Sequence, residues 1–173
     1  MKPIIVLFEN ELRLKDHTAL FEANKKSTVI PLVILDHSYL EEVSPGPVSK
    51  WWLHSSLGQL EDQLKVQGSF LTIRSEGASF ALSKVAYLSG AAEVYLTDHN
   101  SEFYKKRHFD LEYSNSQLNF KYFPESCLTQ RAYPTNGSGH PYKVFTPFWN
   151  KLKTQLIEPI NSEKLIFQKP IST

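Results

Sequence analysis

The chain has 173 residues and a formal net charge of +1, with 19 Lys and Arg side chains against 18 Asp and Glu. This length predicts one domain, and a 41% hydrophobic share argues against a disordered chain. The near-neutral charge argues against a general nucleic-acid binder, and the single cysteine, Cys127, excludes an intrachain disulfide and a cysteine-rich zinc site.

The N-terminal segment gives no targeting signal. Its apolar run, residues 4–8, is shorter than the core of a signal peptide and far shorter than a membrane span. We therefore expect a soluble, cytoplasmic protein that has no membrane partner. We also expect it to be a monomer.

The first half of the chain alternates buried strands with helices. Continuous apolar runs predict strands over residues 4–8 and 29–35. Between them we expect a helix from Asp16, as its cap, to about Lys26, with Leu20 and Ala23 facing the core. After a turn at 44–47, helical spacing predicts a helix that Gly68 ends, with an apolar face comprising Trp52, Leu53, Leu57, Leu60 and Leu64.

The second half repeats the alternation. Strands are predicted over residues 70–73, 93–96 and 120–123, and helices over 80–88, 101–117 and 147–157. Strands that alternate with helices in this way predict an α/β fold, a parallel sheet with helices on both faces. Residues 158–173 read as a connection to a further part of the protein.

Ligands of open parallel sheets bind beyond the carboxyl ends of the strands. This rule selects three loops, 9–13, 36–37 and 97–102, and Trp51 is expected to border them. Their polar groups suit a small polar or heteroaromatic ligand, and the alternative interpretation is that they are solvated loop residues and helix caps. These groups are Glu9, Arg13, Asp36, Asp98, Asn100 and Glu102.

The sequence lacks the motifs of several other binding and catalytic sites. The sequence contains no glycine-rich phosphate loop, no HExxH metal pattern and no GxSxG elbow. The basic run Lys105-Lys106-Arg107 is interpreted as a solvated helix face.

Three segments resemble the DNA photolyase/cryptochrome family. Residues 6–20, VLFENELRLKDHTAL, are similar to its opening pattern W-F-R-x-D-L-R-x-x-D-N-x-A-L. Residues 51–76 resemble its second signature, a helix of the form F-L-x-x-S-L-x-x-L-x-x-x-L followed by x-x-x-G-x-x-L. The segment PYKVFTPFWNKL, at 141–152, resembles the stretch P-Y-x-V-F-T-P-F-W that closes the family's N-terminal domain.

The resemblance implies a Rossmann-like sheet of five parallel strands in the order 3-2-1-4-5. It also implies a light-harvesting domain over residues 1–157, which can hold an antenna chromophore, a reduced folate or a deazaflavin. Residues 158–173 would begin a linker to a helical C-terminal domain that binds FAD. The parent enzyme would be a deoxyribodipyrimidine photolyase, a carbon–carbon lyase that repairs pyrimidine dimers in DNA with blue light, and we expect this chain alone not to be catalytic.

The sequence departs from the family pattern at several loop positions. Glu9 stands where the family has an arginine, Glu11 where it has an aspartate and His17 where it has an asparagine. These changes leave the identity of the chromophore open. The residues that the resemblance and the strand-end rule together assign to cofactor binding are Phe8, Glu9, Arg13, Asp36, Trp51, Thr97, Asp98 and Glu102.

Two other functions fit the sequence. A cryptochrome, which signals instead of repairing DNA, shares the three segments. A stand-alone nucleotide-binding module would share the sheet topology, although the missing glycine-rich loop and the VFTPFW segment disfavour it.

Overall fold

The structure is a computed structural model that describes residues 2–36, 45–125 and 134–154. The chain divides into two compact units. The first comprises residues 1–125 with 162–173, and the second comprises residues 126–161.

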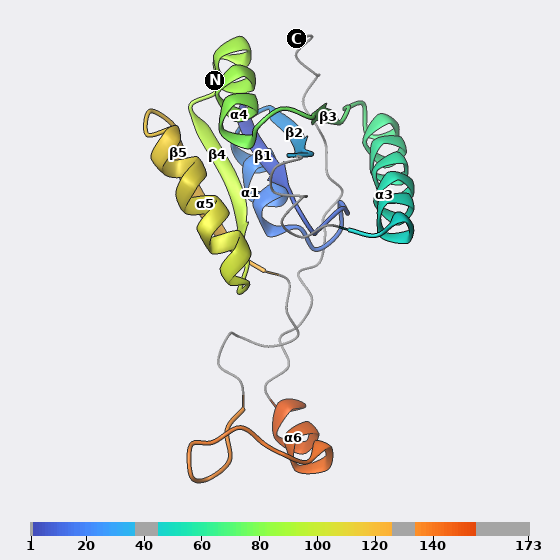
Figure 1. Ribbon diagram of the computed structural model, residues 1–173, viewed down its shortest axis with the longest axis vertical. Coiled ribbons are helices and arrows are strands. Elements are labelled where there is room, and N and C mark those ends of the chain that lie inside the picture. The colour runs from blue at the N-terminus through green and yellow to red at the C-terminus, as the bar shows by residue number, and fades with distance from the viewer. Residues whose placement is uncertain (1, 37–44, 126–133, 155–173) are drawn as a thin grey trace. The chain divides into compact units, whose positions relative to one another are not determined.

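The first unit is built on one parallel sheet, shown in Figure 1. Its strands lie in the order β3-β2-β1-β4-β5, which confirms the predicted fold. All four strand pairs are parallel. The strands are β1 (Ile4–Phe8), β2 (Val29–Ile34), β3 (Thr72–Arg74), β4 (Glu93–Asp98) and β5 (Asn119–Pro124).

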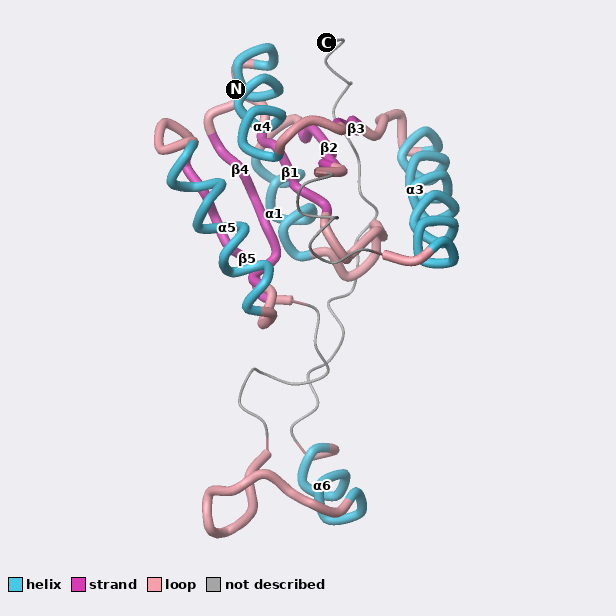
Figure 2. The backbone as a smooth tube through the Cα atoms, in the orientation of Figure 1, coloured by secondary structure: helices cyan, strands magenta, loops and turns pink. Residues whose placement is uncertain are grey.

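Helices cover both faces of this sheet (Figure 2). Side chains of β1 alternate between two apolar cores: Ile4, Val6 and Phe8 pack in one, and Ile5 and Leu7 in the other. This explains why the whole β1 run is apolar. Helices α1 (Thr18–Lys26) and α3 (Pro47–Val66) contribute to the first core, and α4 (Ala78–Ser89) and α5 (Glu102–Ser114) to the second.

The start of α1 differs from the prediction. The helix begins at Thr18 and its cap is His17, whose Nδ1 accepts a hydrogen bond from the Leu20 amide at 3.3 Å. Asp16 instead has a φ of 54°, in the left-handed region, and therefore belongs to the turn before the cap. Leu20 and Ala23 are fully buried, as predicted.

The predicted burial of Trp52 is wrong, because this side chain is 67% exposed. The stripe that α3 presents to the core comprises Leu57, Leu60 and Leu64, with Leu53 partly buried beside it. Trp52 precedes Leu53 by one residue, which rotates it about 100° around the helix, away from this stripe.

The other boundaries in the first unit lie within about three residues of the predicted ones. Gly68 and Gly90 both have positive φ just after α3 and α4, which is the conformation that lets glycine end a helix. Nowhere in the described part of the chain is a helix long and apolar enough to cross a bilayer.

The second unit contains helix α6 (Phe145–Leu152), which begins two residues before the predicted start. The rings of Phe145 and Trp149 stack on this helix with centroids 6.3 Å apart. Before it, the Asn136 side chain accepts hydrogen bonds from the amides of Ser138 and His140 and closes a loop. The predicted extension of this helix to Ile157 is wrong, because α6 ends at Leu152 and Lys153 is its cap. The predicted linker at 158–173, His37 and Cys127 lie outside the described residues.

Candidate functional site

The carboxyl edge of the sheet carries a buried carboxylate, Glu9, directly after β1. Its side chain is only 3% exposed. The Nε2 of His108 lies 2.7 Å from Glu9 Oε2, and the Nε of Arg107 lies 3.3 Å from Oε1. His99, which follows β4, lies 3.7 Å from the same carboxylate and 3.2 Å from Glu125. A buried charge of this kind requires such partners.

The sequence pattern did not predict that Arg107 and His108 contact Glu9. The interpretation of Lys105-Lys106-Arg107 as a solvated face is wrong for Arg107, which is only 8% exposed. The signal was present in the helical phase: Arg107 and His108 precede the buried Leu111 by four and three residues, so all three share one face of α5.

A second buried pair lies beside the first. Thr97, at the end of β4, donates a hydrogen bond to Glu11 at 2.6 Å, and Glu11 also contacts Arg13 at 3.7 Å. The Phe8 ring packs against His17, with centroids 4.5 Å apart. Burial lowers the pKa of His17 to about 4, and Glu11 opposes this shift.

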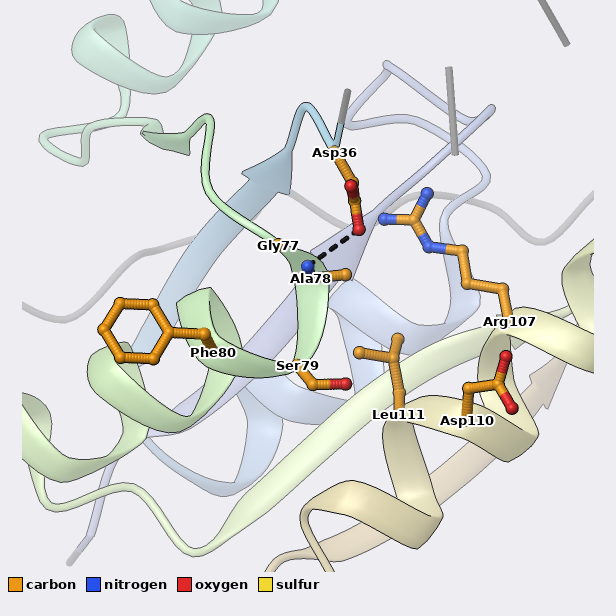
Figure 3. A pocket seen from close by; sticks show the side chains of 8 residues that line it. All are labelled: Asp36, Gly77, Ala78, Ser79, Phe80, Arg107, Asp110 and Leu111. Atoms are coloured by element: carbon orange, nitrogen blue, oxygen red, sulfur yellow. Dashed lines mark hydrogen bonds between the residues drawn. The ribbon is translucent and has the colours of Figure 1, made fainter. Parts of the chain in front are cut away.

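Asp36 lies in a different place, in a pocket of about 320 Å³ between the end of β2, the start of α4 and the middle of α5 (Figure 3). Its Oδ2 accepts a hydrogen bond from the Ala78 amide at 2.8 Å and so caps α4. Arg107 lines the same pocket, and in Figure 3 its guanidinium points toward Asp36. The described lining residues are Asp36, Gly77, Ala78, Ser79, Phe80, Arg107, Asp110 and Leu111.

Arg107 connects this pocket with the Glu9 cluster. Its Nη2 donates to the Ile34 carbonyl at 3.4 Å while its Nε faces Glu9. The guanidinium is therefore held by the last residue of β2 and by the residue that follows β1. Arg107, which was predicted to face solvent, therefore links Glu9 to the pocket that Asp36 lines.

The other predicted residues are more peripheral. Trp51 is 64% exposed and packs beside Trp52, and the Glu102 side chain is 88% exposed and pairs with Lys105 at 2.7 Å. Arg13 is about half exposed, and Asp98 is partly buried at the end of β4. Neither Trp51 nor Glu102 is among the described residues that line the pocket.

The described residues at this edge supply hydrogen-bonding groups. Buried carboxylates accept N–H donors, and Arg107 offers a fixed donor fork. Within residues 2–36, 45–125 and 134–154, no cluster of three or more His, Cys, Asp or Glu side chains has the arrangement of a metal site.

The model of the DNA photolyase family matches residues 4–164. The chain belongs to this family. The predicted resemblance is thereby confirmed, over nearly the whole length of the chain.

Similar photolyases and cryptochromes are longer proteins. A deoxyribodipyrimidine photo-lyase of Agrobacterium fabrum is 31% identical over 87% of this chain and 32% of its own length. Cryptochrome-1 of Arabidopsis thaliana is 30% identical over 90% of this chain and 23% of its own length. The crystal structure of a bacterial class III photolyase from Agrobacterium tumefaciens superimposes with a TM-score of 0.73 at 28% identity, over 99% of this chain and 37% of that one. The chain thus spans about a third of the photolyases it matches.

Proposed function

We propose that this chain is the N-terminal light-harvesting domain of a deoxyribodipyrimidine photolyase. The observation that carries the proposal is the family match over residues 4–164, which corresponds to only about a third of the photolyase relative. In the proposal, residues 1–157 form the domain and residues 158–173 lead to a helical domain that holds FAD. The protein acts as a cytoplasmic monomer on DNA.

The domain's own task is to hold an antenna chromophore, a reduced folate or a deazaflavin, at the carboxyl edge of the sheet. The pocket beside Asp36 fits a ring of this kind, because it combines apolar side chains with buried polar groups. When bound, the chromophore absorbs light and passes the excitation on to the flavin.

The described residues of the chain position such a ring without taking part in chemistry. Asp36 places its carboxylate at the N-terminus of α4, and Leu111 lines the pocket with an apolar side chain. Glu9 contacts the Nε of Arg107 and so restricts the position of the guanidinium. A preorganised site loses less entropy when the ligand binds.

The experiment uses the protein that the complete gene encodes. When it is purified in the dark and its flavin is reduced, it should repair thymine dimers in DNA under blue light. Its absorption spectrum should also contain a chromophore band in addition to the flavin bands. Light-independent DNA binding without repair would contradict the photolyase assignment.

A cryptochrome is the second candidate, because Arabidopsis cryptochrome-1 is nearly as similar to this chain as the Agrobacterium photo-lyase. A cryptochrome would respond to blue light through its flavin and leave thymine dimers unrepaired. The same assay therefore separates the two functions.

A further inference from the structure

We propose that Asn136 is a self-modification site, at which a loop of the second unit converts the asparagine into aspartate or isoaspartate and releases ammonia. Asn136 is followed by Gly137, in a loop whose two ends are joined by an antiparallel bridge between Thr135 and Pro141. The inference concerns the second unit alone, so it does not depend on the photolyase assignment.

The reaction is an attack of the Gly137 backbone nitrogen on the Cγ carbon of Asn136. The Gly137 N–H gives its proton to hydroxide, a bond forms between the nitrogen and Cγ, and Oδ1 carries the negative charge of the tetrahedral intermediate. The bond from Cγ to Nδ2 then breaks, and Nδ2 takes a proton from water and leaves as ammonia. Water opens the resulting succinimide ring at either carbonyl, so one water is consumed for each ammonia released.

Two backbone amides already donate to the oxygen that becomes negatively charged. The amides of Ser138 and His140 lie 3.0 Å from Asn136 Oδ1. Because both partners are donors, the atom that faces them is the side-chain oxygen and not the nitrogen. Paired amides stabilise the oxyanion that forms when a carbonyl is attacked, and their hydrogen bonds strengthen as the charge develops. The loop therefore stabilises the intermediate more than it stabilises the asparagine.

The attacking nitrogen is accessible. Gly137 is exposed, and no described residue accepts a hydrogen bond from its amide. Glycine has no Cβ that would hinder the approach of its nitrogen. The Asn136 amide donates to the His140 carbonyl at 2.9 Å, and the Gly139 amide donates to the Asn136 carbonyl at 3.0 Å. These bonds restrict the backbone on both sides of the reacting groups, which lowers the entropy lost in the attack.

The two products affect the loop differently. Aspartate keeps an acceptor for the amides of Ser138 and His140, so the loop should stay closed. Isoaspartate adds one methylene group to the backbone, which shifts Gly137 and the residues after it. We therefore expect isoaspartate to break the bridge between Thr135 and Pro141.

The experiment incubates the folded chain at neutral pH and compares it with a synthetic peptide of residues 134–141, which has the same sequence without the fixed hydrogen bonds. Peptide mapping by mass spectrometry follows the replacement of the side-chain amide by a carboxyl group, and isoaspartyl methyltransferase labelling counts isoaspartate. We expect Asn136 to react about 10-fold faster in the folded chain than in the peptide.

A variant and an internal control locate the reaction. In Gly137→Ala, the added Cβ meets no atom within 4 Å, so the loop should keep its structure while the methyl group hinders the nitrogen and slows the reaction about 10-fold. The NMR signals of the Ser138 and His140 amides verify that the variant loop is closed. Asn100, which is exposed and precedes a serine, should react more slowly than Asn136 in the same sample.

Three results would overturn the inference. The first is an Asn136 that stays unmodified, and the second is a folded chain that reacts no faster than the peptide, because the hydrogen bonds would then restrain the side chain instead of activating it. The third is a Gly137→Ala variant with a closed loop that reacts at the rate of the parent chain.

Discussion

Two glutamates at opposite ends of the sheet show how differently its edges are built. Glu93 opens β4 at the amino end and pairs with Lys26 at 2.6 Å and Lys121 at 3.0 Å, with its side chain 23% exposed. Glu9 follows β1 at the carboxyl end, with its side chain 3% exposed, and pairs with Arg107 and His108.

The partners explain the difference in role. Flexible lysines at a hydrated edge form ordinary surface ion pairs, and they hold the pKa of Glu93 down at about 2. At the carboxyl end, the Arg107 guanidinium and the His108 ring contact a buried carboxylate. These side chains therefore have little conformational freedom. We therefore expect the buried cluster at the carboxyl end to contribute more to stability than the exposed ion pairs at the amino end.

Removing the buried carboxylate should produce the largest effect. Glu9→Ala leaves Arg107 and its neighbours buried without their anion, and we expect a loss of about 3–5 kcal/mol in the free energy of unfolding. Urea denaturation measures this loss. The matched variant, Glu93→Ala, should lose about 1 kcal/mol or less. Equal losses in the two variants would remove the distinction between the edges.

His17 should make stability depend on pH. Its pKa is about 4 in the folded chain because the ring is buried, against the ordinary 6.5. Between these values the unfolded chain binds a proton that the folded chain does not, so stability is full above pH 6.5 and falls by about 3 kcal/mol as pH decreases to 4.

The variant His17→Asn isolates this effect. Asparagine also caps helices well, so α1 should keep its cap while the titrating ring is lost. Urea denaturation between pH 7 and 4 should show a shallower slope than in the parent chain. An unchanged slope would assign the pH dependence to other groups.

Asp36→Ala should cost about 0.5–2 kcal/mol of stability, because α4 loses the side chain that accepts from Ala78. Asp36→Asn retains an acceptor and should cost less. Thermal denaturation of both variants compares them. If the two variants were equally stable, the hydrogen bond to Ala78 would have no measurable role.

The smallest effect is expected at the amino edge. The lysines hold the pKa of Glu93 below its ordinary 4.5, so the ion pairs contribute above that pH and are lost as pH falls toward 2. Glu93→Gln should therefore change stability by about 1 kcal/mol or less at neutral pH, and less still in high salt. A loss as large as that of Glu9→Ala would show that this edge is not a surface ion-pair site.

The sheet was predictable from the sequence because both of its faces are covered. A strand that is apolar at every position, such as Ile4–Phe8, is typical of a sheet that lies between two layers of helices. Trp52 was misassigned because an aromatic residue one position away from an apolar stripe looks like part of it.

The site was only partly predictable. Glu9, Asp36 and Thr97 follow from the rule that ligands bind at the carboxyl ends of strands. Arg107 belongs to a basic run in the middle of α5, and such a run ordinarily faces water. Its spacing from the buried Leu111 puts it on the inward face, but its contact with Glu9 depends on tertiary packing. Glu102 lies in a loop that the rule selected, and Trp51 was expected to border these loops. Both side chains are exposed, because the rule selects segments and not side-chain directions.

The most direct test of the contrast between the two edges is amide chemical-shift mapping by NMR on the 15N-labelled chain, with a reduced folate and, separately, a deazaflavin added. Our account predicts that the shifts concentrate at Asp36, Ala78 and Arg107 and that Lys26, Glu93 and Lys121 stay unchanged. Shifts centred on Glu93 and its lysines, or a spectrum that responds to a saturating amount of neither chromophore, would contradict it.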